Sequence, residues 1–251
     1  MRGRAARRFW GYEVTIVVVT GDSHCAALKL GFEQFAPPHR GLDIRFQRLG
    51  GGGHVPTPFF AVENGGSSLR IVCPQWLPCR FPDPKIDHEK NNVIYAVSMP
   101  LNTSRILRDF PWGRFVPWQL RRDEDEHALS DQVLREIMWS DVKYAIEFIN
   151  AMVSAKLNVV VVEAPHFFPD SQYLDHSRKE VCCFVSAAYR TFVRAQLSEK
   201  NVPVISQPAS TLDQDGCTLV QYHKGGGDLH HGSAQFGAIM MKELIDYVVD
   251  R

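Results

Sequence analysis

The sequence predicts an α/β protein in which helices cover both faces of a central, mostly parallel sheet. Stretches rich in β-branched residues alternate along the chain with stretches whose apolar residues recur at helical spacing. The segment 158–162 (NVVVV) is apolar on both faces, as expected of a parallel strand buried between two helical layers. Together these observations predict a three-layer α/β/α sandwich.

The first third of the chain opens with a strand at 14–20, a Gly-Asp-Ser turn and a helix at 26–35. A second strand is expected at 42–49, and it runs directly into four consecutive glycines at 50–53. Residues 58–73 read as an inserted β-hairpin, because two strand-like segments flank the turn sequence Asn-Gly-Gly.

The remaining elements continue the alternation of strand and helix. A strand at 92–100 precedes a loop and a connection at 110–126, which is either a lid over a site or only a loop. Trp112 and Trp118 in that connection could stack on a sugar ring, but packing in a core is favoured. Further elements are expected at 130–156 (helix), 158–162 (strand), 178–200 (helix), 202–206 (strand) and 233–249 (helix).

Composition and charge exclude several classes of protein. The 251 residues include 45% hydrophobic and 22% charged residues, which is typical of a globular domain. Because 28 basic residues balance 28 acidic ones, we expect no nucleic-acid partner. The first apolar run is too short to cross a bilayer, so no membrane partner is expected. We predict a basic, disordered segment at 1–11 and a single domain at 12–251.

The six cysteines lack the paired spacing of zinc sites. Reduced thiols in a cytoplasmic protein are the preferred interpretation. The oligomeric state is left open.

Ser23 directly follows the first predicted strand, at the point where a helix begins. Backbone N–H groups and the helix dipole favour a developing anion there, although a serine in this position can also be a simple helix cap. A serine is nucleophilic only beside a general base, and a histidine base needs a third group to orient it. Asp228 and His231, just ahead of the last helix, offer both, unless they only decorate the start of that helix.

Two sequence blocks resemble the SGNH (GDSL-like) hydrolases. TGDSH at 20–24 is similar to their GDS block, and DLHHGSAQFGAIM at 228–240 is similar to their closing Asp-x-x-His block. The blocks stand first and last, as in that family, so the resemblance covers nearly the whole chain. It implies a serine esterase without a cofactor, in which Ser23 is the nucleophile, His231 the general base and Asp228 the group that orients it.

The resemblance also implies an oxyanion hole built from the N–H groups of Ser23, a glycine and an asparagine. Gly51 and Gly52, within the run 50–53, match the place of the glycine. Asn102 matches the asparagine, although the Gly-x-Asn-Asp pattern usual in the family is missing here. The alternative for Asn102 is a turn with a capping residue.

Four further side chains are expected to line the substrate site: His24, Glu163, His166 and His230. The segment around Glu163 also resembles a strand of the family that is mainly scaffold. A metal site at Asp228, His230 and His231 is an alternative, but adjacent residues point in different directions and rarely bind one ion. We therefore predict no metal.

The predicted function is hydrolysis of a small O-acyl ester through an acyl-enzyme, with an O-acetyl group on a carbohydrate among the candidates. An acyltransferase that uses the same three residues is one alternative. A catalytically inactive binding protein of the same fold is another. A nucleotide-binding protein is a weaker alternative, because the glycine run lacks both the Gly-x-Gly-x-x-Gly spacing and the Walker lysine.

Overall fold

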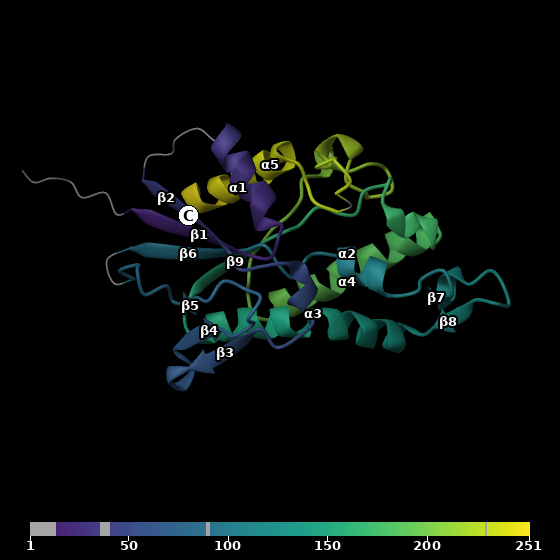
Figure 1. Cartoon of the computed structure of the whole chain (residues 1–251), viewed down its shortest axis with the longest axis horizontal. Helices are drawn as coiled ribbons and strands as arrows, with labels where there is room; N and C mark the ends of the chain where they lie inside the picture. Colours follow the sequence, from purple (N-terminus) through teal and green to yellow (C-terminus); the bar gives the residue numbers. More distant parts are fainter. Residues whose placement is uncertain (1–13, 36–40, 89–90, 229) are drawn as a thin grey trace, which may run out of the picture.

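A five-stranded parallel sheet forms the centre of the computed structural model, which describes residues 14–35, 41–88, 91–228 and 230–251 (Figure 1). The strand order is β10-β9-β6-β1-β2, and every neighbouring pair is parallel. The strands are β1 (Thr15–Gly21), β2 (Leu42–Arg48), β6 (Asn92–Val97), β9 (Asn158–Val162) and β10 (Val204–Ile205). The predicted basic segment 1–11 lies outside the described residues.

Helices cover both faces of this sheet, as Figure 1 shows. Alternate residues of β1 face opposite layers: Val17 and Val19 belong to one apolar cluster, and Ile16 and Val18 belong to the other. The first cluster contains residues of α1 (Cys25–Phe35) and α5 (Ala234–Val249), and the second contains residues of α3 (Asp131–Ser154) and α4 (Lys179–Ser198). The predicted three-layer α/β/α sandwich is confirmed.

The inserted hairpin is also confirmed, and it has a third strand. Strands β3 (Phe60–Glu63) and β4 (Ser68–Ile71) pair antiparallel, and β5 (Arg80–Phe81) extends this small sheet. Short 3-10 helices lie at Gly52–His54, Asn64–Gly66, Trp118–Leu120, Gln172–Asp175, Ala209–Thr211 and Val220–Tyr222.

The connection at 110–126 contains more regular structure than expected. The short helix α2 (Ser104–Asp109) precedes it, and β7 (Phe115–Pro117) pairs parallel with β8 (His127–Leu129) just beyond it. Trp112 is buried, as the favoured interpretation required, whereas Trp118 is 56% exposed.

The topology places the switch point of the sheet at the carboxyl ends of β1 and β6. The chain passes from β1 to β2 on one side and then returns to add β6 on the other side of β1. Connections that leave two neighbouring strands in opposite directions open a crevice between them, which is where ligands bind in sheets of this type. Ser23 follows β1 and Asn102 follows β6, so both stand at this switch point.

Within the described ranges, no helix has both the length and the apolar character needed to cross a bilayer. The six cysteines are free thiols, and four of them are buried.

Candidate active site

Ser23 is held at the end of β1 by the glycine that precedes it by two residues. Gly21 has a φ of 133°, and a Cβ atom there would lie 2.6 Å from the Oγ atom of Ser98. Only glycine fits this backbone next to β6. The chain can therefore turn sharply after β1, which leaves Ser23 half-buried at the first turn before α1.

A hydrogen-bonded chain links Ser23 to His231 and Asp228. The Nε2 atom of His231 lies 2.8 Å from Ser23 Oγ, and its Nδ1 atom lies 2.9 Å from both carboxylate oxygens of Asp228. The backbone N–H groups of His230 and His231 donate to Asp228 Oδ1 at 3.1 and 2.9 Å. When His231 carries its proton on Nδ1 and donates it as a hydrogen bond to Asp228, Nε2 is left as an acceptor for the hydroxyl of Ser23.

The close packing of α1 against α5 explains how residues 208 positions apart come together. A Cβ atom on Gly237 of α5 would overlap the carbonyl oxygen of Ala27, and one on Gly31 of α1 would overlap the backbone N of Ala238. The two helices therefore touch backbone to backbone. Ser23 precedes α1 and His231 precedes α5, so this contact draws the two side chains to one place.

The surroundings of the hydrogen-bonded chain favour an ionised Asp228 and neutral rings at His24 and His230. Burial raises the pKa of Asp228, but Lys224 at 2.9 Å and the N–H groups of His231 and His230 outweigh burial, so the pKa lies below its usual value. Burial lowers the pKa of both His24 and His230 to about 4. The two neighbouring rings are thus neutral near pH 7 and oppose no positive charge on His231.

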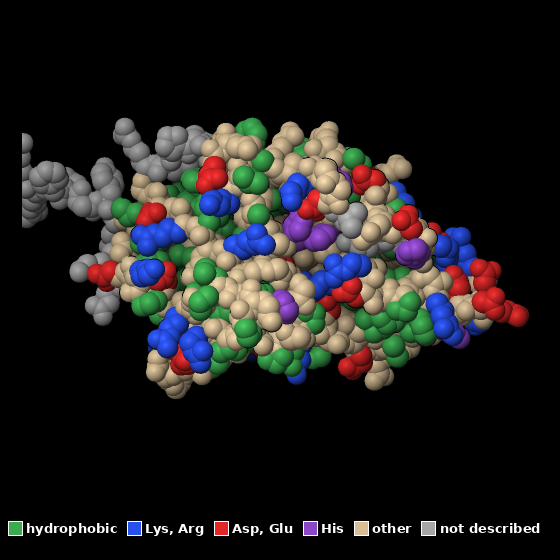
Figure 2. Space-filling view, in the orientation of Figure 1, with side chains coloured by type: hydrophobic (Ala, Val, Ile, Leu, Met, Phe, Trp, Pro, Cys, Tyr) green, Lys and Arg blue, Asp and Glu red, His purple; other side chains and the backbone are tan. Residues whose placement is uncertain are grey.

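The histidine rings lie side by side. The ring of His231 is 4.1 Å from that of His230 and 5.0 Å from that of His24, measured between centroids. Both ring nitrogens of His24 are buried and lack a hydrogen-bond partner among the residues that the structure describes. On the face shown in Figure 2, histidine side chains gather near the middle, between basic and acidic groups.

Asn102 lies beside the buried carboxylate of Asp22, the residue that precedes Ser23. Its Oδ1 atom accepts hydrogen bonds from the backbone N and the hydroxyl of Ser104, which closes a turn there, while Thr103 at the N-cap of α2 makes no side-chain capping bond. Its Nδ2 atom points to Asp22 Oδ2 at 3.4 Å. Asp22 also accepts a bond from the backbone N of His24 at 3.0 Å. One amide thus both closes the turn at Ser104 and donates to the residue that precedes Ser23.

The two glycines predicted for the oxyanion hole have different surroundings. A Cβ atom on Gly52 would lie 3.2 Å from Asp22 Oδ2 and 3.9 Å from Asn102 Nδ2, whereas one on Gly51 would meet no atom within 4 Å. The carbonyl of Gly51 accepts a bond from the indole N–H of Trp76 at 3.1 Å. Gly52 is therefore the one that faces Asp22 and Asn102.

Arg105 belongs to this neighbourhood and was not identified from the sequence. It is buried and forms two hydrogen bonds with Asp141, at 3.0 and 2.8 Å. Its Nη1 atom is buried without a hydrogen-bond partner in the described part of the chain and lies 3.4 Å from the position of a Gly52 Cβ atom. No motif or spacing distinguishes this arginine from the other arginines of the sequence.

Glu163 and His166 belong to a different, buried network. The carboxylate of Glu163 contacts Arg190 at 2.6 Å and Arg194 at 2.8 Å. His166 lies 3.6 Å from the same carboxylate, and its Nδ1 atom is 2.7 Å from the carbonyl oxygen of Gly216. No contact recorded for the described residues joins Glu163 or His166 to Ser23 or His231.

The possible metal ligands lie near one another. Asp228, His230 and His231 each offer one ligand atom, and these atoms lie within 4.8 Å of one another. Both nitrogens of His231, however, already face partners, namely Asp228 and Ser23. An ion bound to His231 would have to displace one of them.

Neither a family model nor a curated protein matches the sequence. Solved structures similar in fold include an extracellular lipase from Streptomyces rimosus, with 11% identity, a TM-score of 0.49 and coverage of 93% of this chain and 99% of the lipase. A lipase/acylhydrolase from Enterococcus faecalis has 12% identity and a TM-score of 0.42, with coverage of 95% and 97%.

A G-D-S-L family structure from Desulfitobacterium hafniense has 12% identity and a TM-score of 0.45, with coverage of 92% of this chain and 97% of that one. At these identities the likeness concerns the fold alone. These three structures each align with more than nine tenths of this chain.

Proposed function

We propose that this chain is a serine esterase of the SGNH kind that hydrolyses a small O-acyl ester, with an O-acetyl group on a carbohydrate as the leading candidate. The observation that carries the proposal is the hydrogen-bonded chain from Ser23 Oγ through His231 to Asp228. It lies at the switch point of the sheet, where chemistry collects in this fold.

In the first half-reaction Ser23 Oγ attacks the carbonyl carbon while His231 Nε2 takes the hydroxyl proton. Asp228 stabilises the imidazolium that forms. The tetrahedral intermediate then collapses, the C–O bond to the alcohol breaks, and His231 returns its proton to the departing alcohol oxygen. In the second half-reaction a water molecule attacks the acyl carbon while His231 takes its proton, the bond from that carbon to Ser23 Oγ breaks, His231 returns the proton to Ser23 Oγ, and the acid is released.

The negative oxygen of the tetrahedral intermediate needs hydrogen-bond donors. We assign this role to the backbone N–H groups of Ser23 and Gly52 and to the side-chain amide of Asn102. The amide carries two N–H bonds, and Asp22 engages Nδ2 at 3.4 Å, which orients the group while leaving a second N–H to donate. Loss of one such donor typically costs about 10² to 10³ in turnover.

The test is hydrolysis of p-nitrophenyl esters, from acetate to octanoate, by the parent and by Ser23→Ala and His231→Ala. Both variants should lose about 10⁴-fold or more in kcat, because removing either member disables proton transfer and attack together. His127→Ala is the matched control, since His127 is exposed on β8. A fluorophosphonate should label the parent at Ser23 and leave Ser23→Ala unlabelled.

The outcomes separate the alternatives. A parent that neither hydrolyses any ester nor accepts the label would support the inactive binding protein instead. Activity that EDTA abolishes would support the metal site at Asp228, His230 and His231. Transfer of the acyl group to an added alcohol in preference to water would indicate the acyltransferase.

A further inference from the structure

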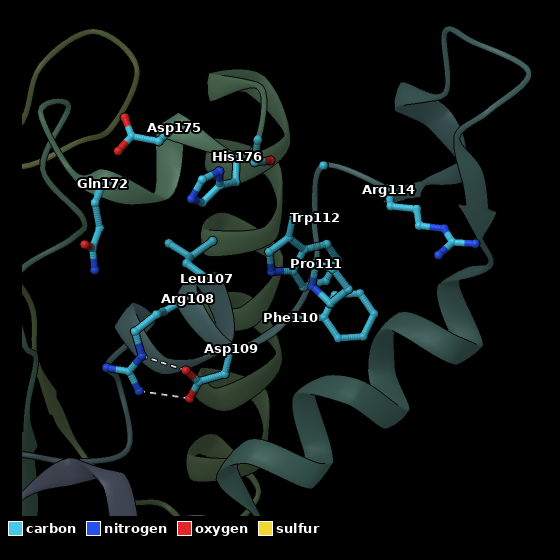
Figure 3. A pocket seen from close by; sticks show the side chains of 12 residues that line it. Leu107, Arg108, Asp109, Phe110, Pro111, Trp112, Arg114, Gln172, Asp175 and His176 are labelled. Carbon is cyan, nitrogen blue, oxygen red and sulfur yellow. Dashed lines mark hydrogen bonds and ion pairs between the residues drawn. The ribbon is translucent and has the colours of Figure 1, made fainter.

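Arg105 and Arg108 stand about one turn apart on α2, and their surroundings differ. The side chain of Arg108 is 41% exposed, and its guanidinium bonds the neighbouring Asp109 at 2.6 and 2.9 Å (Figure 3). Arg105 is only 3% exposed. A buried charge is costly unless it is paired and hydrogen-bonded, so each edge of the Arg105 guanidinium needs a partner of opposite charge.

Asp141 of α3 pairs with one edge of this guanidinium. Its carboxylate accepts hydrogen bonds from the Nε and Nη2 atoms of Arg105 at 3.0 and 2.8 Å, and it also accepts the hydroxyl of Tyr189 at 2.7 Å. Burial lowers the pKa of Arg105, but the charge of Asp141 outweighs burial, and that of Asp22 acts in the same direction, so the pKa is raised. Because the guanidinium is planar, Nη1 is held on the side away from Asp141.

The Nη1 atom of Arg105 faces the buried carboxylate of Asp22. Nη1 has no hydrogen-bond partner in the described part of the chain. The position that a Cβ atom on Gly52 would take lies 3.4 Å from Nη1 and 3.2 Å from Asp22 Oδ2, so the two atoms approach the same point. The donors that Asp22 does have, the backbone N of His24 at 3.0 Å and Asn102 Nδ2 at 3.4 Å, carry no charge. Arg105 therefore supplies a positive charge that balances Asp22.

Asp22 in turn closes the turn that contains Ser23. Its Oδ1 atom accepts a hydrogen bond from the backbone N of His24 at 3.0 Å, and its backbone carbonyl accepts one from the backbone N of Cys25 at 3.2 Å. Ser23 lies inside both bonds, and its Oγ atom is 2.8 Å from His231 Nε2. A side chain bonded to the backbone two residues ahead fixes the local chain direction. A shift of the carboxylate would therefore move Ser23 relative to His231.

We propose that Arg105 is a positioning residue of the active site, whose charge holds the carboxylate of Asp22 in place so that the turn presents Ser23 to His231. The proposal rests on the esterase function proposed above and adds a residue to that same site. Arg105 does not touch the reacting atoms, and its effect passes through Asp22. Its removal should lower kcat more than it changes KM, because the alignment of Ser23 matters for the attack and not for the binding of the ester.

The first experiment is a double-mutant cycle, in which kcat and KM for p-nitrophenyl acetate are measured for Arg105→Gln, Asp22→Asn and the variant with both changes. Each single change should lower kcat about 10- to 100-fold, since small displacements of a nucleophile have effects of this size. The double variant should be little worse than the more impaired single variant, because the two residues act as one unit. Arg135→Gln, at an exposed position of α3, is the control and should keep the parental kcat.

The cycle separates the proposal from the function on which it rests. An active parent whose losses multiply in the double variant would overturn the role of Arg105 alone, because Arg105 would then act independently of Asp22. A parent without esterase activity would overturn the esterase function and the proposal together. Thermal unfolding shows which variants fold. Where Arg105→Gln does not fold, Arg105→Lys, which keeps the charge, replaces it in the cycle and should lose less kcat than Asp22→Asn.

A second measurement separates the charge of Arg105 from its packing. In Arg105→Ala, added guanidinium chloride, far below the concentrations that unfold the protein, should raise kcat about tenfold or more by returning the cation to its place. Urea, an uncharged molecule of the same planar shape, is the matched control and should not raise it. Equal rescue by the two compounds, or rescue by neither, would overturn the proposal.

Discussion

Two segments of the chain share the spacing acid-x-x-His but are used differently. In one, Asp228 and His231 lie 2.9 Å apart, and the far nitrogen of the imidazole faces the hydroxyl of Ser23. In the other, Glu163 and His166 lie 3.6 Å apart, and the far nitrogen faces a backbone carbonyl. The partner on the far side of the ring therefore decides whether such a pair can activate a nucleophile.

The two carboxylates also differ in what stabilises their charge. Burial raises the pKa of Glu163, but the charge of Arg190 and the contacts with His166 and Arg194 outweigh it, and the pKa is lowered. The guanidinium groups of Arg190, which is buried, and Arg194, which is half-buried, thus balance the charge of Glu163. Asp228 is held by backbone N–H groups and an exposed lysine, so it can still stabilise a positive charge that appears on His231.

The sharpest way to test this comparison is Asp228→Asn. The amide cannot fix the imidazole tautomer or stabilise the imidazolium, so kcat for p-nitrophenyl acetate should fall by about 10⁴-fold. Thermal unfolding measured alongside should show that the variant remains folded. A loss below about tenfold would mean that His231 acts without Asp228, and the two acid-x-x-His segments would then differ less than their geometry indicates.

Glu163→Gln should lower the stability of the fold strongly and kcat only weakly, the reverse of what we expect for Asp228→Asn. It leaves the buried Arg190 without its ionic partner, which typically costs about 3 to 5 kcal/mol of unfolding free energy. Urea unfolding followed by circular dichroism measures this loss, and kcat of the folded fraction should fall far less than in Asp228→Asn. Glu199→Gln, at the exposed end of α4, is the control and should change the stability by about 0.5 kcal/mol or less. A stable but inactive Glu163→Gln would place Glu163 in the active site after all.

The two regions should also lose stability in different pH windows. Burial lowers the pKa of His24 from 6.5 to about 4, so the fold holds this ring neutral while the unfolded chain binds a proton. Its contribution is fully present above pH 6.5 and is lost as the pH falls toward 4, which amounts to about 3 kcal/mol for a shift of this size. The lowered pKa of Glu163 gives a contribution that is lost only below its ordinary pKa of 4.5.

The variant that separates these windows is His24→Leu, because the ring of His24 has no hydrogen-bond partner to lose among the described residues. Melting temperatures measured from pH 7 to pH 4 should fall less steeply for the variant than for the parent. If the melting temperatures of the parent and of His24→Leu fell equally with pH, His24 would be protonated in the folded protein, and its surroundings would differ from the buried ones described here.

The sequence was sufficient to predict the central architecture and the three linked residues, for identifiable reasons. Long elements such as α3 and β9 carry enough residues for their periodicity to be recognised. Ser23 and His231 each stand directly before a helix, and in an α/β sheet the starts of such helices converge at one edge. Their meeting could therefore be predicted without knowledge of the packing between α1 and α5.

Other features depend on contacts that a linear pattern does not contain. Strands of two or three residues, such as β5 and β7, are too short to show alternation. Glu163 could be expected near the carboxyl ends of the strands from its place after β9, but its role depends on Arg190, which is 27 positions away on α4. Arg105 and the choice of Gly52 over Gly51 likewise follow only from which atoms lie across the loop.

The smallest expected effect concerns that choice of glycine. In Gly52→Ala the new Cβ atom would lie 3.2 Å from Asp22 Oδ2 and 3.4 Å from Arg105 Nη1, so the loop or the carboxylate must shift by a few tenths of an ångström. Because Asp22 orients Asn102 beside Ser23, kcat for p-nitrophenyl acetate should fall about 10- to 100-fold. At Gly53 a Cβ atom would meet nothing within 4 Å, so Gly53→Ala is the matched control and should behave like the parent. Equal kcat values for the two variants would show that Gly52 does not contribute to the reaction. The difference between the Asp228/His231 pair and the Glu163/His166 pair would then depend on Ser23, His231 and Asp228 alone.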